Sequence, residues 1–385
     1  MLPLEGITVL ALEQAIAAPF ASRQLADLGA RVIKVERPAV GDFARNYDTT
    51  VNGMSSHFVW TNRSKESIEL DLKSKKGKEV LQRLLDKADV LIQNLAPGAL
   101  ERIGFVPEEL VKKHPKLIVC SISGYGKGGT YEHKKAYDLL VQCEAGLVSI
   151  TGSEDTPSKA GISIADIAAG MYAYSGILTA LFNREKTGKG AVLDVSMLEA
   201  LGEWMGYPAY YAAYGGEEPK RSGASHATIY PYGPFTCGDG KIVFIGLQNE
   251  REWRHFCDIV VEDPKLYGDP RFSTNSDRSA NRGKLKEIIE RAFDELSSND
   301  VIERLEKVKI ANARLNTMKD FFRHPQLQAR DRWEQIQTPN GVIDALKPPA
   351  VIAGMEAVMN PIPALGEHTE KILEEIGIKQ GELHN

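Results

Sequence analysis

The sequence lacks most of the motifs that identify a catalytic centre directly. It contains four widely spaced cysteines, Cys120, Cys143, Cys237 and Cys257, and no CxxC pair. This pattern argues against a disulfide framework and against a thiolate metal site, and it favours buried thiols in a reducing compartment. Neither an HExxH zinc motif nor a GxSxG nucleophile elbow occurs. We therefore expect no metal site.

The chain also lacks a strong charge of one sign and long hydrophobic runs. Its net charge is −5 with 26% charged residues, and no basic stripe offsets this mild acidity, so we expect no nucleic-acid partner. No segment approaches the roughly 18 uninterrupted apolar residues of a membrane span. The N-terminus shows no basic and then apolar signal pattern. These absences predict a cytoplasmic protein without a membrane partner.

Short apolar runs followed by helical patterns predict an α/β fold with a parallel sheet. Pro19 suits the first turn of a helix that ends near Gly29, and a second helix is expected from Lys75 to Ala88. The segment from Phe43 to Lys65 has no periodicity and is expected to be a long functional or docking loop. The predicted strands are Ile7–Leu12, Arg31–Glu36, Ser67–Leu72, Val90–Gln93, Leu117–Ser123 and Ala191–Val195.

The pattern changes after residue 200, which at a length of 385 residues suggests a second domain. A single aromatic helix is expected from Met197 to Tyr214, either as a packing face or as a buried crossing between domains or subunits. A hairpin is expected from Tyr230 to Leu247, and a last helix from Thr369, its expected cap, to about Ile376. The predicted parts are a large α/β domain (1–200), a linker helix and loop (201–228), a small α+β domain (229–325) that includes helices at 280–294 and 298–307, and a final segment (326–385).

One carboxylate, Asp166, stands at the start of a run of small and apolar residues at helical spacing from Ile162 to Leu181. No basic residue lies within six positions of it. It is either an N-cap or first-turn acid, stabilised by free backbone N–H groups, or a functional carboxylate in a cleft. Spacing alone favours the cap.

Several basic residues are predicted near the carboxyl ends of strands, where open α/β sheets bind ligands. Each alone is best explained as a solvated surface charge. Together they could hold a polyanionic cofactor, because basic side chains and helix N-termini favour phosphates. These residues are Arg37, Lys65, Lys73, Arg102 and Lys135.

An ordered set of stretches resembles one family over nearly the full length. The stretches are AAPFASRQLADLGARVIKVERPAVGD, SIELDLKSKKGKEV, IQNLAPGALERIG, HKKAYDLLVQCEAGLVSITG, IADIAAGMYAYSGILTALFNREKTGKG and LGEHTEKILEEIG. Together they are similar to the class III CoA-transferases, the group of formyl-CoA:oxalate and carnitine CoA-transferases that also contains the α-methylacyl-CoA racemases.

The resemblance implies a Rossmann-like large domain, a small domain and a final segment that returns to the large domain. It also implies an interlocked homodimer of two ring-like subunits. Asp166 matches the catalytic aspartate that attacks the acyl-CoA thioester. CoA esters are then substrates, and no tightly bound cofactor is expected. The positions that match CoA-contacting segments are Ile16, Ala17, Arg37, Leu70, Asp71, Leu72, Lys73, Asn94, Leu95, Arg102, Lys135, Tyr137 and Asp138.

Two departures from the family pattern bear on the substrate. Formyl-CoA transferases carry glutamine at the position of Ile16 and a glycine-rich lid that this chain lacks, which weakens the expectation of oxalate as acceptor. Racemases carry histidine at the position of Tyr137, so its absence favours transfer over racemisation.

The predicted activity is transfer of CoA from a donor such as succinyl-CoA to a free carboxylic acid, through an aspartyl-CoA thioester. A short dicarboxylate is the expected acceptor, with His226 and Arg221 as candidates to hold the second carboxylate. These two residues are equally well explained as ordinary loop residues. An acyl-CoA racemase or epimerase and a catalytically silent CoA-binding protein remain alternatives.

Overall fold

A computed structural model describes residues 2–378, and the chain divides into two compact units. Unit 1 comprises the chain up to Leu147, Ala160–Tyr210 and the chain from Leu327, and unit 2 comprises Val148–Lys159 and Tyr211–Gln326. The segment 148–159, expected in the large domain, therefore belongs to unit 2. Arg221 holds it there, because its guanidinium donates hydrogen bonds to the carbonyls of Ser149, Ser153 and Glu154.

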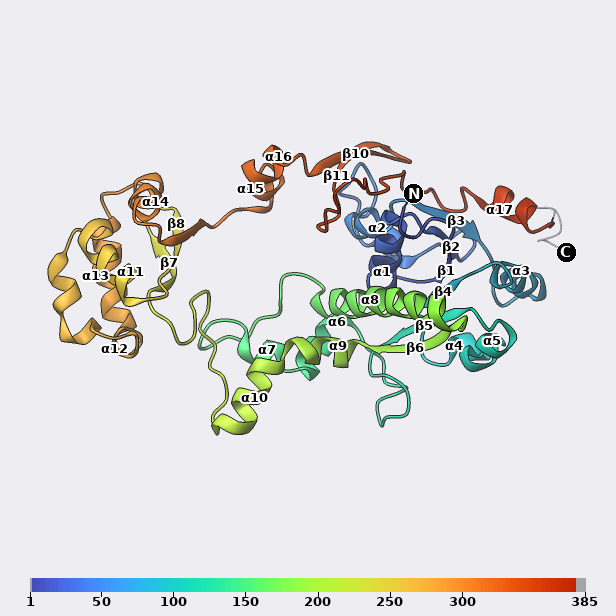
Figure 1. Ribbon diagram of the computed structural model, residues 1–385, viewed down its shortest axis with the longest axis horizontal. Coiled ribbons are helices and arrows are strands. Elements are labelled where there is room, and N and C mark those ends of the chain that lie inside the picture. Colours follow the sequence, from blue (N-terminus) through green and yellow to red (C-terminus); the bar gives the residue numbers. More distant parts are fainter. Residues whose placement is uncertain (1, 379–385) are drawn as a thin grey trace. The chain divides into compact units, whose positions relative to one another are not determined.

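Unit 1 is built on a six-stranded sheet in which every neighbouring pair is parallel (Figure 1). The strand order is β3-β2-β1-β4-β5-β6, so the direction of winding reverses between β1 and β4. The strands are β1 (Thr8–Leu12), β2 (Arg31–Glu36), β3 (Lys65–Glu69), β4 (Val90–Gln93), β5 (Ile118–Ser123) and β6 (Ala191–Ser196). All six predicted strands are present, and β3 begins and ends two to three residues before its predicted limits.

Helices cover both faces of this sheet, which explains why its central strands β1, β4 and β5 are mostly apolar runs, whereas the edge strand β3 is mostly polar. On one face, α1 (Ala17–Asp27), α6 (Asp138–Glu144), α8 (Ile164–Thr187) and α9 (Met197–Trp204) form one core cluster with the strands. On the other face lie α3 (Lys75–Leu85), α4 (Ala99–Arg102), α5 (Pro107–Lys113) and α17 (Thr369–Glu375). The final segment thus returns to unit 1, as α17 packs beside β3.

Two local expectations in unit 1 are wrong. The segment from Phe43 to Lys65 is not without structure, because it contains η1 (Phe43–Asn46) and α2 (Ser56–Thr61). Thr369 does not cap α17, whose N-cap position is His368. Its hydroxyl instead accepts a hydrogen bond from the Glu69 N–H at the end of β3. A hairpin of β10 (Trp333–Thr338) and β11 (Gly341–Leu346) and the short helix α16 (Pro325–Ala329) precede α17.

The predicted aromatic helix is two helices, because α9 ends before Met205 and α10 (Gly206–Gly215) begins after it. Pro208 has no N–H for the carbonyl of Trp204, which removes one helical hydrogen bond at the break. The aromatic residues of α9 and α10 are between 42% and 85% exposed in the single chain. They are Trp204, Tyr207, Tyr210, Tyr211 and Tyr214.

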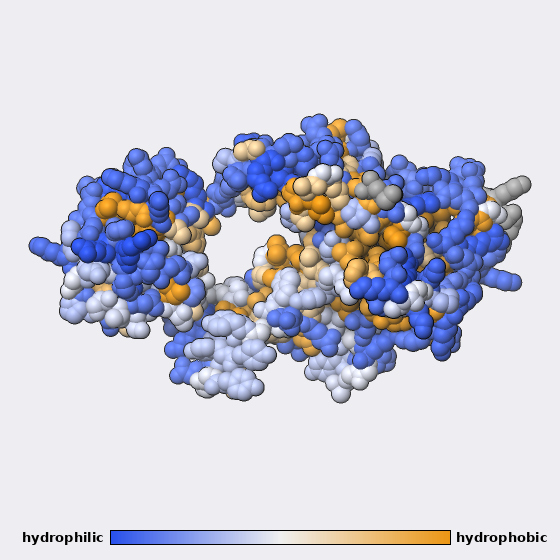
Figure 2. All heavy atoms as spheres, in the orientation of Figure 1, coloured by the Kyte–Doolittle hydropathy of each residue, from blue (hydrophilic) through white to orange (hydrophobic). Residues whose placement is uncertain are grey.

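Helix α8 is long and apolar enough to cross a membrane by length and composition alone. Its buried residues, which include Ala165, Ala169 and Ile177, belong to the core that packs on the sheet. Its other face is also apolar, and hydrophobic residues gather where α8 runs in the space-filling view (Figure 2). Tyr172 and Phe182 on that face are 37% and 65% exposed.

Unit 2 contains an antiparallel sheet of β7 (Tyr232–Thr236), β8 (Ile242–Gly246) and β9 (Ala311–Arg314). The first two strands form the predicted hairpin. The helical segments are α7 (Leu147–Ile150, at the boundary with unit 1), α11 (Glu250–His255), η2 (Phe256–Val260), η3 (Pro264–Gly268), η4 (Pro270–Phe272), α12 (Asn275–Ala280), α13 (Arg282–Phe293), α14 (Ser298–Lys307) and α15 (Met318–Phe322).

Candidate active site

A cavity of about 830 Å³ opens at the carboxyl edge of the parallel sheet in unit 1. Its walls come from residues that follow β1, β2, β3, β4 and β5, together with Met197 after β6 and the start of α8. This is the place where open α/β sheets bind ligands, at the point where the strand order reverses. Asp166 lines the cavity from the first turn of α8.

The position of Asp166 depends on a close crossing between α8 and α1. A Cβ atom added to Gly170 would lie 2.7 Å from the carbonyl oxygen of Ala17, so only glycine permits this approach. Asp166 lies four residues before Gly170, one helical turn along the same face. The crossing therefore brings the Asp166 carboxyl to the start of α1, where Ile16 and Ala17 also line the cavity.

Asp166 is an acid in the first turn of α8, one of the two local roles that spacing favoured, but it is not the N-cap. The N-cap position is Ser163, whose side chain makes no capping hydrogen bond. Asp138, at the start of α6, supplies the cap instead, because its Oδ1 accepts the Ala165 N–H at 2.8 Å and the Asp166 N–H at 3.4 Å. The Asp166 side chain is thereby left to the cavity.

Burial raises the pKa of Asp166 to about 7, and the nearby charge of Asp138 adds to the increase. The side chain of Tyr47 lines the same cavity. Burial raises its pKa to about 12, with further increases from the charges of Asp42 and Asp166. Near neutral pH the site thus holds a carboxyl group close to its titration point and a phenol that keeps its proton.

Another part of the cavity wall is the turn between β1 and α1, and hydrogen bonds fix its conformation. Ala15 has a φ of 60°, unusual for a residue with a side chain. Its N–H donates to Asp42 Oδ1 at 3.0 Å. Asn94, which follows β4, accepts the Gln14 N–H and donates to the Gln14 carbonyl, each at 2.8 Å. The turn is therefore held by Asp42, the N-cap of η1, and by Asn94, which follows β4.

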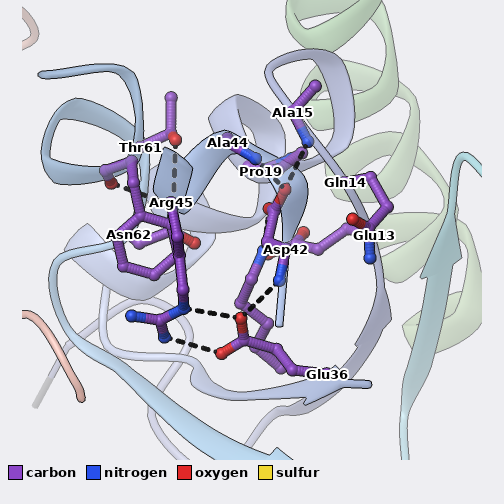
Figure 3. A network of polar contacts seen from close by, with 12 residues as sticks. Glu13, Gln14, Ala15, Pro19, Glu36, Asp42, Ala44, Arg45, Thr61 and Asn62 are labelled. Atoms are coloured by element: carbon purple, nitrogen blue, oxygen red, sulfur yellow. Dashed lines mark hydrogen bonds and ion pairs between the residues drawn. The ribbon is translucent and has the colours of Figure 1, made fainter. Parts of the chain in front are cut away.

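A fully buried group of charges lies beneath this turn, and Figure 3 shows two of its members, Glu13 and Asp42. Lys34 Nζ contacts Asp42 Oδ2 at 2.8 Å and Glu13 Oε1 at 3.2 Å, and Lys65 Nζ contacts Glu13 Oε1 at 2.7 Å. Burial lowers the pKa of Lys65 to about 7, against the opposing attraction of Glu13. Lys65 begins β3 and is enclosed, so its predicted place among surface or cofactor-binding cations is wrong.

A second ion pair supports the same region from the end of β2 (Figure 3). Arg45 donates from Nε and Nη2 to the two carboxylate oxygens of Glu36 at 2.8 and 2.7 Å. Glu36 also accepts the Asp42 N–H at 2.9 Å. Burial opposes ionisation of Glu36, but the hydrogen bonds from Arg45 and Ser67 and the charges of Lys34 and Arg45 lower its pKa to about 2. Asp42 is thus fixed on both its main chain and its side chain.

Almost all of the predicted site residues meet at this cavity. With Asp166, the lining includes Ile16, Ala17, Arg37, Leu70, Asp71, Leu72, Lys73, Asn94, Leu95, Lys135, Tyr137 and Asp138. Their contact with CoA stays a prediction. Arg102 is not among the lining residues, and its Nη1 donates to the Pro97 carbonyl at 3.1 Å. His226 lies in unit 2, where its Nδ1 accepts the N–H groups of Thr228 and Ile229. Its proposed contact with substrate also stays a prediction.

Sequence reasoning did not identify several lining residues, above all Gln14, Phe43, Tyr47, His57 and Lys134. Three of these lie in the segment from Phe43 to Lys65. The length of that segment had indicated a functional loop, but no motif distinguished its individual side chains.

The comparisons with known proteins agree with this geometry. The model of CoA-transferase family III matches residues 4–369. The chain belongs to CoA-transferase family III. It is 35% identical over 380 residues to a mouse succinyl-CoA:glutarate CoA-transferase, covering 98% of this chain and 87% of the relative. An Acetobacter aceti acetyl-CoA:oxalate CoA-transferase is 36% identical, covering 86% and 85% of the two chains.

A comparison with solved structures also matches this chain over nearly its full length. A CAIB/BAIF family protein from Brucella suis has a TM-score of 0.88 at 33% identity and covers 97% of this chain and 99% of its own. The protein is therefore an enzyme, a CoA-transferase, and its relatives act on CoA thioesters and carboxylic acids.

Proposed function

We propose that this enzyme moves CoA from a donor such as succinyl-CoA to a short dicarboxylic acid, with Asp166 as the nucleophile. The observation that carries the proposal is the placement of Asp166, which is free of a capping role and half-buried in a cavity at the switch point of the sheet. Relatives support the substrate class, since a succinate–glutarate CoA-transferase from Agrobacterium fabrum is 33% identical over 97% of this chain and 96% of its own.

The reaction needs only carboxylates and the CoA thiol. The ionised carboxylate of Asp166 attacks the thioester carbon of the donor, CoA thiolate leaves, and a mixed anhydride forms. The thiolate attacks the aspartyl carbonyl carbon, releases the donor acid and leaves an aspartyl-CoA thioester. The acceptor carboxylate attacks that thioester and displaces CoA thiolate. The thiolate finally attacks the acceptor carbonyl carbon and frees Asp166.

Each step places negative charge on a carbonyl oxygen, which the start of α1 is suited to stabilise. The crossing at Gly170 sets the first turn of α1 beside Asp166, and first-turn N–H groups have no partner within their own helix. Such N–H groups act as oxyanion donors when they are aimed at the reacting carbonyl. The locked turn at Ala15 would keep this geometry constant between the four steps.

The phosphates of CoA are expected along the rim formed by the ends of β2 and β3 and the segment before α6. Arg37, Lys73 and Lys135 line the cavity there. Hydrogen bonds between charged partners of this kind are worth roughly 1.5–3 kcal/mol each.

We also infer an interlocked homodimer, in keeping with the resemblance described above. The exposed aromatic residues of α9 and α10 and the exposed apolar face of α8 support this inference, because apolar surfaces of this extent are usually covered by a partner. A cytoplasmic location is proposed with it.

The test is an assay of purified enzyme with succinyl-CoA or acetyl-CoA against a panel of mono- and dicarboxylic acids, with products resolved by mass. Formation of a new acyl-CoA from a dicarboxylate supports the proposal. Loss of α-deuterium from an acyl-CoA without any acceptor would indicate a racemase. Binding of CoA without transfer to any acid would indicate a silent protein. Light scattering that gives a monomer would contradict the dimer.

A further inference from the structure

The cavity contains a histidine that the proposed transfer of CoA does not use. His57, in the first turn of α2, lines the cavity together with Asp166. Its Nδ1 lies 3.5 Å from Asp48 Oδ2, and its side chain is 44% exposed. Among the described residues, 2–378, the structure gives Nε2 of this ring no protein partner. The ring is therefore anchored at one nitrogen and accessible at the other.

The anchor of His57 is unusually well fixed for a residue in a loop. The Asp48 carboxylate accepts hydrogen bonds from the N–H and hydroxyl groups of both Thr50 and Ser56, at 2.5 to 3.2 Å. These bonds, from Thr50 first, hold the pKa of Asp48 well below its usual range. Asp48 therefore stays a carboxylate, with one side turned to the histidine ring.

Tyr47 connects this pair with the reacting carboxyl group. Its ring meets the His57 ring edge-on, with centroids 5.3 Å apart at 90°. The charge of Asp166 contributes to the raised pKa of Tyr47, so the phenol also lies near the nucleophile. The cavity thus presents, in order, a nucleophilic carboxylate, a phenol and a histidine.

We propose that His57 selects dicarboxylates by binding the carboxylate at the end of the substrate that does not react. This inference rests on the proposed function and names the residue behind its substrate class. A dicarboxylate with one end at Asp166 must place its second charge one short aliphatic chain away. His57 can meet that charge through Nε2, because Nδ1 faces Asp48 and Ser56, each at 3.5 Å.

The other basic groups of the cavity are less suited to this task. Lys134 forms an ion pair with Glu144, and its ammonium lies 4.1 Å from the centre of the Tyr131 ring. Arg37, Lys73 and Lys135 line the rim assigned to the CoA phosphates. His226 does not line the cavity and is held by hydrogen bonds within its own loop of unit 2. We therefore place the carboxylate contact at His57.

The experiment compares acids of equal length that carry one or two carboxylates. Wild-type enzyme, His57→Phe and His57→Gln are assayed with glutarate against valerate and with succinate against butyrate, using one acyl-CoA donor. His57→Phe should lower kcat/KM for the dicarboxylates about ten- to a hundredfold, mainly through KM, because it removes a hydrogen bond to a charge. The monocarboxylates should change less than about twofold, as expected for a group that contacts only the second carboxylate. His57→Gln, which keeps an N–H donor, should recover part of the loss.

A matched control is His114→Phe. His114 Nε2 also lies 3.5 Å from an aspartate, Asp86, but this pair is outside the cavity. The control should leave the ratio of dicarboxylate to monocarboxylate activity unchanged. Circular dichroism melts of all variants exclude loss of fold.

Several results would overturn the inference. Equal use of mono- and dicarboxylates by the wild type, or an equal loss for both in His57→Phe, would remove the selective role while leaving CoA transfer intact. Loss of α-deuterium that disappears in His57→Phe would make this residue a base instead. Absence of transfer from the wild type to every acid would reject the proposed function itself, and this inference with it.

Discussion

The interior around the cavity of unit 1 and the core of unit 2 differ in the kind of side chain that they bury. Unit 2 buries the aromatic side chains of Trp253, Phe235, Phe256, Phe272 and Phe293 with at most 1% exposure. Around the cavity of unit 1, the residues with no exposed surface include the polar residues Glu13, Lys34, Asp42 and Ser67.

The two interiors contribute different things to the molecule. Burial of apolar surface stabilises a fold by about 25 cal/mol per Å², without preferred direction. Buried charges lose hydration that their attraction only partly offsets, but each contact requires a defined geometry. The aromatic core therefore holds unit 2 together, whereas the charges in unit 1 fix the turn at Ala15 against Asp166. We expect substitutions to separate these roles, and the largest effect to occur at the nucleophile.

Replacement of Asp166 by Asn should reduce kcat by at least about a thousandfold, because an amide cannot act as the nucleophile that forms the anhydride. Stability should not fall, because Asp138 rather than Asp166 caps α8. The measurements are turnover with the best acid found and a thermal melt. As a complement, hydroxylamine or borohydride added to the wild type with acyl-CoA should modify Asp166 alone. Near-normal turnover, or an adduct at another carboxylate, would contradict the mechanism.

As pH rises, activity should increase and stability should decrease. The reason is that Asp166, which must be ionised to react, has a pKa raised to about 7. Below pH 7, kcat/KM should fall about tenfold per unit as Asp166 takes up its proton. The folded protein then binds a proton that an unfolded aspartate, with a pKa near 3.9, releases. This contribution to stability is complete below about pH 4 and is lost as pH rises through 7. The free energy of unfolding, measured by urea titration at several pH values, should fall with rising pH in the wild type more than in Asp166→Asn. The same pH dependence in both proteins would refute the raised pKa of Asp166.

Glu13→Gln should destabilise unit 1 by about 3–5 kcal/mol, because it leaves two buried ammonium groups without their shared carboxylate. The double substitution Glu13→Leu with Lys65→Met should recover much of this loss, since it replaces both charges of an ion pair by apolar side chains of similar size and leaves neither charge buried without its partner. Urea unfolding measures both effects.

If the charges fix the turn at Ala15, the double variant should regain stability without regaining full kcat. Full recovery of both would mean that the polar interior has no positioning role. No recovery of stability would mean that packing rather than charge holds this region.

Ile289→Val should give the smallest effect, a loss of about 0.5–1.5 kcal/mol in unit 2, because it removes one buried methylene group from α13. We expect kcat and the preference for dicarboxylates to stay within about twofold of wild type. Urea unfolding and the assay described above provide both measurements. A loss of activity in a variant that stays folded under the assay conditions would contradict the separate roles of the two interiors.

The sequence alone determined the elements whose signals are local. Most strands of the parallel sheet are short apolar runs, β3 excepted, and the hairpin at 237–240 has its own turn residues, so both were predicted near their observed limits. Ordered motifs along the chain also indicated the family and Asp166. These features depend on residues that are neighbours in the chain, where periodicity and turn chemistry act directly.

Only the tertiary structure decided which polar groups meet. Asp138 accepts the N–H of Ala165, 27 residues further along the chain, and so supplies the cap, whereas Asp166 is only a first-turn acid of the same helix. Lys65 is paired with Glu13 across 52 residues, which turned an expected surface cation into a buried one. His57 becomes a candidate for specificity only because the segment that carries it folds over the end of the sheet beside Asp166. Contacts of this kind leave no periodic signal in the sequence, because they depend on the crossing of elements rather than on the conformation of any one of them.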